Sequence, residues 1–115
     1  MADQRGRAAE YAAQSALERD GWVILARRVR TSAGEIDLVA EKEGLLAIVE
    51  VKCRQDLASA AESLSARQRA RLVCATEIML LDHPHWGENG VRFDLIVVDA
   101  YGVVRRIADA FRGTE

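Results

Sequence analysis

Residues 34–52 read GEIDLVAEKEGLLAIVEVK, two apolar segments separated by a short polar turn. The segment Gly34–Glu41 alternates in polarity, which predicts a strand with two different faces. The segment Leu45–Cys53 is apolar on both faces until Glu50 and Lys52, which indicates a central strand covered on both sides. The alternation of the first segment predicts Ile36 and Leu38 on one face, and Asp37 and Val39 on the other. We therefore expect a β-hairpin at the centre of the fold.

This hairpin would bring charged side chains together. A turn centred on Glu43 and Gly44 places Asp37 directly opposite Glu50, with Cβ atoms about 4.5–5.5 Å apart. Lys52 follows Glu50 by two residues and points to the same face. Opposed like charges destabilise a buried hairpin unless they are compensated. Two interpretations remain open: an ion network completed by Lys52, or a site for a divalent cation such as Mg²⁺ or Mn²⁺.

The segments on either side of the hairpin predict helices and further strands, and together they indicate an α/β fold with a mixed sheet and helices packed against it. Small apolar residues at helical spacing and a glycine stop mark the first helix, and a capping box marks the second. The predicted elements are a helix over Arg5–Arg19 ending at Gly21, a strand over Trp22–Val29, a helix opened by Ser65 and Gln68 and ending before Pro84, a strand over Val91–Ala100, and a weaker strand over Val103–Ile107.

The composition narrows the class of protein. The chain has 115 residues, of which 50% are hydrophobic and 30% are charged, which is typical of one globular domain over residues 1–115. The longest apolar run, Leu45–Val49, is too short to cross a bilayer, and the N-terminus lacks the apolar stretch of a signal peptide. We therefore expect a cytoplasmic protein with no membrane partner. The net charge of −2 argues against coating of nucleic acid by bulk charge. The basic residues are 14 arginines and two lysines, Lys42 and Lys52, and arginine suits bidentate phosphate recognition.

The strings GEID and VEVKCR, at residues 34–37 and 49–54, carry a family resemblance. Together they resemble the Asp … Glu-x-Lys signature of the PD-(D/E)xK nuclease superfamily. More narrowly, the chain resembles the YraN family of small bacterial proteins. The match extends over nearly the whole chain and includes residues 6–10 and 92–94. The resemblance implies a restriction-endonuclease-like αβββαβ core with a mixed central sheet flanked by helices, similar to archaeal Holliday-junction resolvases.

The resemblance also implies roles for individual residues. Asp37 and Glu50, together with the backbone carbonyl of Val51, would hold a divalent metal ion. Lys52 would orient the attacking water or stabilise charge that develops on the phosphate. Glu10, in the first helix, matches an acidic residue that completes the metal site in related nucleases. Gln68 is similar to a helix glutamine that helps to position the lysine or the metal shell in resolvase-type nucleases; its other interpretation is a capping-box side chain.

These observations lead to two functional hypotheses. The first is a Mg²⁺- or Mn²⁺-dependent endonuclease that acts on DNA, with branched or flapped structures as candidate substrates. Its likeness to resolvases suggests a homodimer. The second is a nucleic-acid-binding or assembly module that keeps the nuclease fold without catalysis. Retention of Asp37, Glu50 and Lys52 together favours the enzyme, whereas the lack of an overall basic charge favours the second hypothesis.

Overall fold

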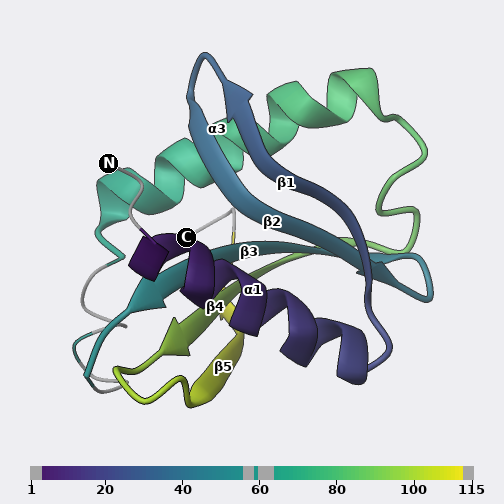
Figure 1. Cartoon of the computed structure of the whole chain (residues 1–115). Coiled ribbons are helices and arrows are strands. Elements are labelled where there is room, and N and C mark those ends of the chain that lie inside the picture. Colours follow the sequence, from purple (N-terminus) through teal and green to yellow (C-terminus); the bar gives the residue numbers. More distant parts are fainter. Residues whose placement is uncertain (1–3, 56–58, 60–63, 113–115) are drawn as a thin grey trace.

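The computed structural model describes residues 4–55, 59 and 64–112, and it has the α/β architecture that the sequence predicts (Figure 1). In the described part of the chain, two long helices accompany a sheet of five strands. In chain order, the elements are α1 (Gln4–Arg19), β1 (Val23–Thr31), β2 (Gly34–Lys42), β3 (Leu45–Cys53), α3 (Ala66–Asp82), β4 (Val91–Val98) and β5 (Val104–Phe111).

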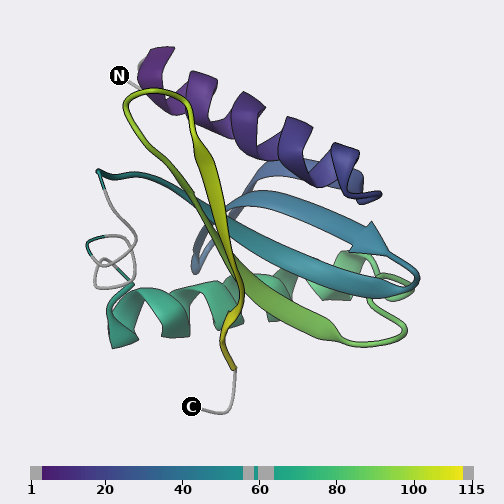
Figure 2. The same ribbon diagram turned by 90° about the horizontal axis from the view of Figure 1, so that it is seen from below.

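The sheet is mixed, as expected. Its strand order is β1-β2-β3-β4-β5, in which β3 and β4 run parallel and the other neighbouring pairs are antiparallel. A parallel pair needs a crossover connection, and α3 lies in the connection between β3 and β4. Figure 2 shows α1 and α3 on opposite faces of the sheet. This αβββαββ arrangement is compatible with a restriction-endonuclease-like core.

Each helix covers its own apolar core. On the α1 side, Ala9, Ala13 and Leu17 pack with strand residues of the sheet that include Leu38, Ala40, Ala47, Val49, Ile96 and Val98. On the α3 side, Leu72, Ala75 and Met79 pack with Ile36, Val39, Leu46, Ile48, Phe93 and Phe111. The central strand β3 contributes buried residues to both cores, which confirms the expectation that it is covered on both faces.

The central hairpin has the predicted register. Glu43 and Gly44 both have left-handed backbone conformations, with φ of 52° and 79°, as a two-residue type I′ turn requires. This turn pairs Lys42 with Leu45, and the ladder continues to the pair Leu38–Val49. The next positions along the two strands are Asp37 and Glu50, so the turn chemistry places the two carboxylates at the end of the ladder.

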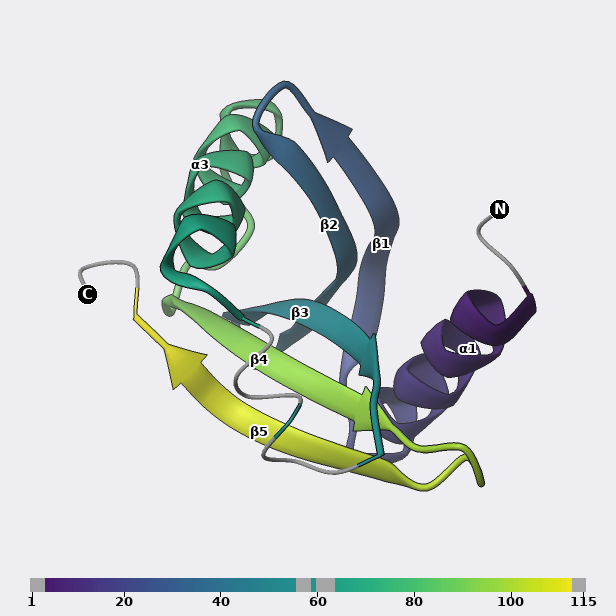
Figure 3. The ribbon, with the colours of Figure 1, turned by 90° about the vertical axis from the view of Figure 1, so that its left-hand side faces the viewer.

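One expectation about this hairpin is wrong. The alternation of β2 predicts Ile36 and Leu38 on the same face, but Leu38 belongs to the α1 core and Ile36 to the α3 core, together with Val39. The physical reason is that β2 leaves β3 beyond Leu38 and curves with β1 towards α3 (Figure 3). A strand that bends in this way changes the direction of its side chains relative to the rest of the sheet.

The remaining elements differ from their predictions mainly at the ends. The strand predicted over Trp22–Val29 covers Val23–Thr31, and the one predicted over Val103–Ile107 continues to Phe111. The capping box of Ser65 and Gln68 is present with both of its hydrogen bonds. None of the helices that the structure describes is both long and apolar enough to span a bilayer.

Candidate active site

Asp37 and Glu50 meet where the β2–β3 ladder ends. The carboxylate of Asp37 accepts a hydrogen bond from the backbone N–H of Val51, with an N···O distance of 2.8 Å. A side chain of β2 therefore satisfies a donor of β3 just beyond the last backbone pair, Leu38–Val49. This bond holds Asp37 against the strand that carries Glu50.

Lys52 lies next to Glu50, as its place in β3 predicts. Its Nζ atom is 3.7 Å from Oε1 of Glu50, and the two side chains are only 16% and 18% exposed. A separation of 3.7 Å is longer than a charge-assisted hydrogen bond. The ammonium group therefore compensates one of the two carboxylates, and only in part. The other lysine, Lys42, is used elsewhere and donates to the backbone carbonyl of Asp20 near the end of α1.

The electrostatics of the pair show how incomplete this compensation is. Burial, together with the neighbouring charge of Asp37, raises the pKa of Glu50 to about 8 against the opposing effect of Lys52. Hydrogen bonding to Asp37 also raises the pKa of Glu50. Burial raises the pKa of Asp37 as well, although the Val51 N–H opposes that shift. The site therefore favours fewer negative charges than its two carboxylates carry in water.

This set of oxygen donors has the chemistry of a Mg²⁺ or Mn²⁺ site. Both ions prefer carboxylate and carbonyl oxygens and bind through few protein ligands, keeping several water molecules. Asp37 and Glu50 supply two carboxylates at a position where positive charge is lacking. Among the residues that the structure describes, no group of three or more His, Cys, Asp and Glu side chains is assembled for a metal ion. The two carboxylates are thus the candidate ligands that the structure brings together, and the resemblance of the motifs adds the carbonyl of Val51 as an expected third ligand.

Glu10, the third predicted acidic ligand, lies in α1 and is paired with an arginine. Its Oε1 atom accepts a hydrogen bond of 2.8 Å from Nε of Arg28 in β1. The charge of Glu10 nevertheless contributes to the raised pKa of Asp37, so Glu10 is close enough to affect the site electrostatically. In this structure Glu10 neighbours the carboxylate pair without forming one cluster with it.

Gln68 faces the site from α3. A cavity of about 160 Å³ lies between the hairpin and the start of this helix. The cavity is lined by Gly34, Glu35, Glu50, Leu64, Gln68, Arg71 and Leu72. Gln68 therefore forms the predicted capping box, in which its Oε1 atom accepts the N–H of Ser65 at 3.2 Å. It also lines the same cavity as Glu50, and its role in positioning Lys52 or a metal shell stays a prediction.

Two residues of this region were missed as members of the site by reasoning from the sequence. Arg71 lines the cavity with Glu50, one helical turn after Gln68, and an i, i+3 spacing from Gln68 was the available signal. Arg28 lies opposite Asp37, because the ladder pairs Arg27 with Leu38 and Val29 with Ile36. The register of β1 against β2 was not assigned from the sequence, so no signal placed Arg28 there.

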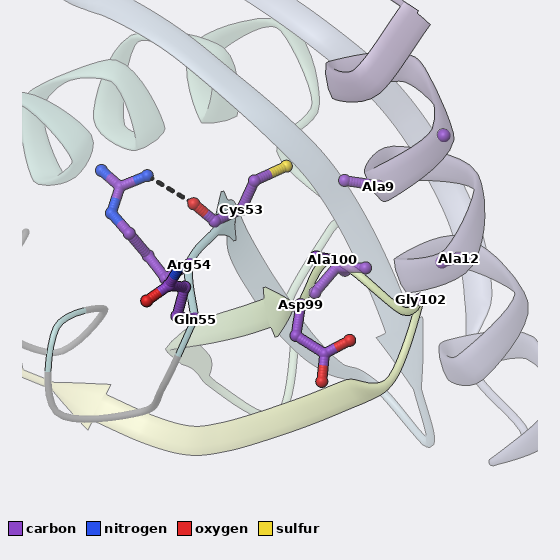
Figure 4. Close-up of a pocket in the computed structure, with 10 residues that line it drawn as sticks. Ala9, Ala12, Cys53, Arg54, Gln55, Asp99, Ala100 and Gly102 are labelled. Atoms are coloured by element: carbon purple, nitrogen blue, oxygen red, sulfur yellow. Dashed lines mark hydrogen bonds between the residues drawn. The ribbon is translucent and has the colours of Figure 1, made fainter.

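A larger cavity lies elsewhere. It has a volume of about 350 Å³ and is formed by α1, the ends of β3 and β4, and the turn that follows β4. Figure 4 shows Cys53, Arg54 and Asp99 at this cavity, where Arg54 donates a hydrogen bond to the backbone carbonyl of Cys53. Neither Asp37 nor Glu50 lines it. Its size therefore does not make it the candidate active site.

A second buried carboxylate, Asp94 in β4, has a different environment. Its side chain is 0% exposed, and it accepts hydrogen bonds from the guanidinium groups of Arg92 and Arg106 at 2.8–3.0 Å. The backbone N–H of Asp109 donates to the same carboxylate at 2.8 Å. Both arginines also lie over the ring of Trp22, at 5.2 and 4.9 Å from its centroid. Asp94 is thus fully compensated by the protein, which fits a structural role.

The fold and the site together define a class of protein. It is an α/β protein whose five-stranded mixed sheet is flanked by two helices and carries a partly buried carboxylate pair and a lysine at the end of a central hairpin. The family model described as Uncharacterised protein family UPF0102 matches residues 9–98. The chain belongs to this family, also called YraN, as its motifs indicated.

Three relatives illustrate the match. A UPF0102 protein of Granulibacter bethesdensis is 60% identical over 111 residues, which cover 96% of this chain and 70% of the relative. A UPF0102 protein of Azorhizobium caulinodans is 49% identical over 96% of this chain and 84% of its own length. A third, from Acidiphilium cryptum, is 45% identical over 99% of this chain and 88% of its own length. The similarity therefore covers both helices and the sheet.

Proposed function

We propose that this protein is a Mg²⁺- or Mn²⁺-dependent endonuclease of the cytoplasm that hydrolyses phosphodiester bonds in DNA. The observation that carries the proposal is the partly compensated carboxylate pair of Asp37 and Glu50, with Lys52 beside it. Like charges held together in a buried place cost stability, and a protein retains such a feature where function requires it.

The proposed ligands of the metal ion are Asp37, Glu50 and the carbonyl oxygen of Val51. When bound there, the ion would neutralise charge on the phosphate and lower the pKa of a water molecule. The N–H of Val51 orients Asp37 through the 2.8 Å hydrogen bond, so the same residue would serve the site with both of its backbone groups.

The other residues of the site would act on the phosphate and the water. Lys52 is placed within a few ångströms of Glu50, where its ammonium group would stabilise the additional negative charge of the transition state. Gln68 and Arg71 face the same cavity from α3, and a guanidinium can bind two phosphate oxygens at once. Attack of water on phosphorus with cleavage of the bond to the 3′ oxygen would leave a 5′-phosphate and a 3′-hydroxyl, to which a proton is transferred.

A panel of labelled linear, flapped and four-way DNAs, incubated with Mg²⁺, Mn²⁺ or EDTA, tests this proposal. We expect cleavage with metal and none with EDTA. Asp37→Asn and Glu50→Gln should each abolish it, because each removes a charged ligand at constant size. Glu77→Gln, at an exposed position of α3, is the matched control and should cleave like the wild type. Equal cleavage by Asp37→Asn would refute the proposal.

A second candidate function is a nucleic-acid-binding or assembly module without catalysis. The observation that favours it is the pairing of Glu10 with Arg28, which leaves the carboxylate pair without a third acidic side chain. The same panel separates the two candidates. Retention of labelled DNA on the protein without cleavage under any metal condition would support the module and exclude the enzyme.

A further inference from the structure

A second surface adjoins the carboxylate pair on the side of α1. A groove with a cavity of about 200 Å³ runs between α1 and β1 and is lined by Arg7, Glu10, Tyr11, Gln14, Arg27 and Arg28. Three arginines face one glutamate here, although the whole chain has a net charge of −2. The groove therefore concentrates positive charge beside a site that is itself acidic.

The backbone conformation of β1 brings two of these arginines to the same side of the strand. Consecutive residues of a regular strand point to opposite faces of the sheet, so Arg27 and Arg28 would ordinarily be separated. Arg28, however, has a left-handed backbone conformation with φ of 51°, which costs free energy for a residue that is not glycine. As a result, both arginines line the same groove. Such strain is found where the direction of a side chain matters.

Both arginines are held in place by α1. Nη1 of Arg27 donates to Oε1 of Gln14 at 3.3 Å, and Nε of Arg28 donates to Glu10 at 2.8 Å. A guanidinium has five N–H donors, and each of these contacts occupies one of them. The groove adjoins the strand that carries Asp37, because the residues on either side of Arg28 pair with Leu38 and Ile36, the neighbours of Asp37 in β2.

Tyr11 gives the groove a second kind of binding group. Its side chain projects from α1 among the arginines and is 66% exposed. An exposed aromatic ring beside cationic side chains is the usual platform for an unpaired base, whose face is accessible, whereas the bases of a duplex are already stacked on one another. The combination of ring and guanidinium groups thus fits a nucleotide in a single strand.

We propose that the α1–β1 groove binds unpaired, single-stranded nucleic acid, with a base stacked on Tyr11 and backbone phosphates on Arg7, Arg27 and Arg28. The placement of this strand next to the scissile bond rests on the proposed function, but binding in the groove does not require cleavage. The groove would direct the protein to junctions at which a single strand leaves a duplex.

Fluorescence anisotropy with a labelled oligothymidylate in EDTA tests the proposal without any cleavage. We expect Tyr11→Ala to weaken binding about tenfold, because it removes the ring on which one base stacks. Tyr11→Phe keeps an aromatic ring and should bind like the wild type. Tyr101→Ala is the matched control, because Tyr101 is 92% exposed in the turn between β4 and β5, away from the groove. Arg27→Ala should lower the salt dependence by about one phosphate contact, and Arg105→Ala on β5 should leave it unchanged.

The outcomes separate this proposal from the nuclease. Loss of binding in Tyr11→Ala with a wild type that cleaves none of the DNAs would support the groove and refute the nuclease. Unchanged affinity in Tyr11→Ala, beside a wild type that cleaves DNA, would refute the groove alone. The groove is also overturned if the wild type does not bind the oligonucleotide at low salt, or if Tyr101→Ala weakens binding as much as Tyr11→Ala. Tighter binding to a blunt duplex than to the single strand would likewise contradict it.

Discussion

Two acidic regions of the same sheet, Asp94, which is buried, and the pair of Asp37 and Glu50, which is partly buried, have opposite electrostatic environments. Asp94 in β4 is surrounded by two arginines and a backbone N–H, so its negative charge is compensated by groups of this chain. Asp37 and Glu50 share one backbone N–H and one lysine, which is 3.7 Å from Glu50. The difference shows that burial of a carboxylate does not by itself identify a site. A candidate ligand site is identified instead by negative charge that the positive groups of the fold do not compensate.

The largest expected effect of a single substitution falls on the compensated region. Asp94→Asn removes the charge that two partly buried arginines share, and we expect a loss of about 3 kcal/mol in the free energy of unfolding. Urea denaturation measures this loss, with Glu77→Gln as an exposed control. A variant as stable as the wild type would mean that water solvates the two arginines well enough without Asp94. This outcome would contradict a structural role of Asp94.

The second largest effect is expected from metal ions, which should stabilise the folded protein through Asp37 and Glu50. An ion bound to Asp37 and Glu50 stabilises the folded state by mass action, by about 2.7 kcal/mol at a concentration of 100 times the dissociation constant. We expect melting curves of the wild type to shift upwards with excess Mn²⁺ relative to EDTA, and those of Asp37→Asn to lose most of the shift. A wild type that is indifferent to Mn²⁺ and Mg²⁺ would contradict the metal site.

The pH dependence of metal-free stability should be smaller per pH unit and specific in sign. The pKa of Glu50 is raised from 4.5 to about 8 in the folded protein. Between these values the folded state holds a proton that the unfolded state has lost, so stability falls as pH rises, by at most about 1.4 kcal/mol per pH unit. Denaturation in EDTA at a series of pH values measures this slope. Glu50→Gln should make the profile flatter, and an identical slope in the variant would show that another group causes it.

The smallest effect is expected for Asp37→Asn without metal. The asparagine keeps an oxygen that can accept the N–H of Val51, while the charge of Asp37 that opposes ionisation of Glu50 disappears. We expect stability in EDTA to be unchanged or up to about 1 kcal/mol higher. The interpretation of the pair as an ion network predicts the opposite sign. Marked destabilisation of Asp37→Asn in EDTA would therefore support the ion network.

Local patterns in the sequence predicted much of this site. The Glu43–Gly44 turn determines the register that brings Asp37 to Glu50, and the alternation of β3 carries Lys52 to the side of Glu50. The capping box of Ser65 and Gln68 begins the helix that covers the site. These features depend on neighbours within a few residues along the chain, so they can be inferred before the rest of the fold is known.

The surroundings of each carboxylate were decided by the tertiary structure. Arg106 reaches Asp94 from a different strand, where an irregularity in β5 also presents the N–H of Asp109. Arg28 lies beside Asp37 in the sheet because β1 pairs with β2, and its guanidinium is bound by Glu10 of α1. The sequence by itself thus determined which acidic residues meet in the hairpin. Which buried charge is compensated depends on side chains brought from distant segments, because electrostatic interactions act through space and no local pattern encodes them.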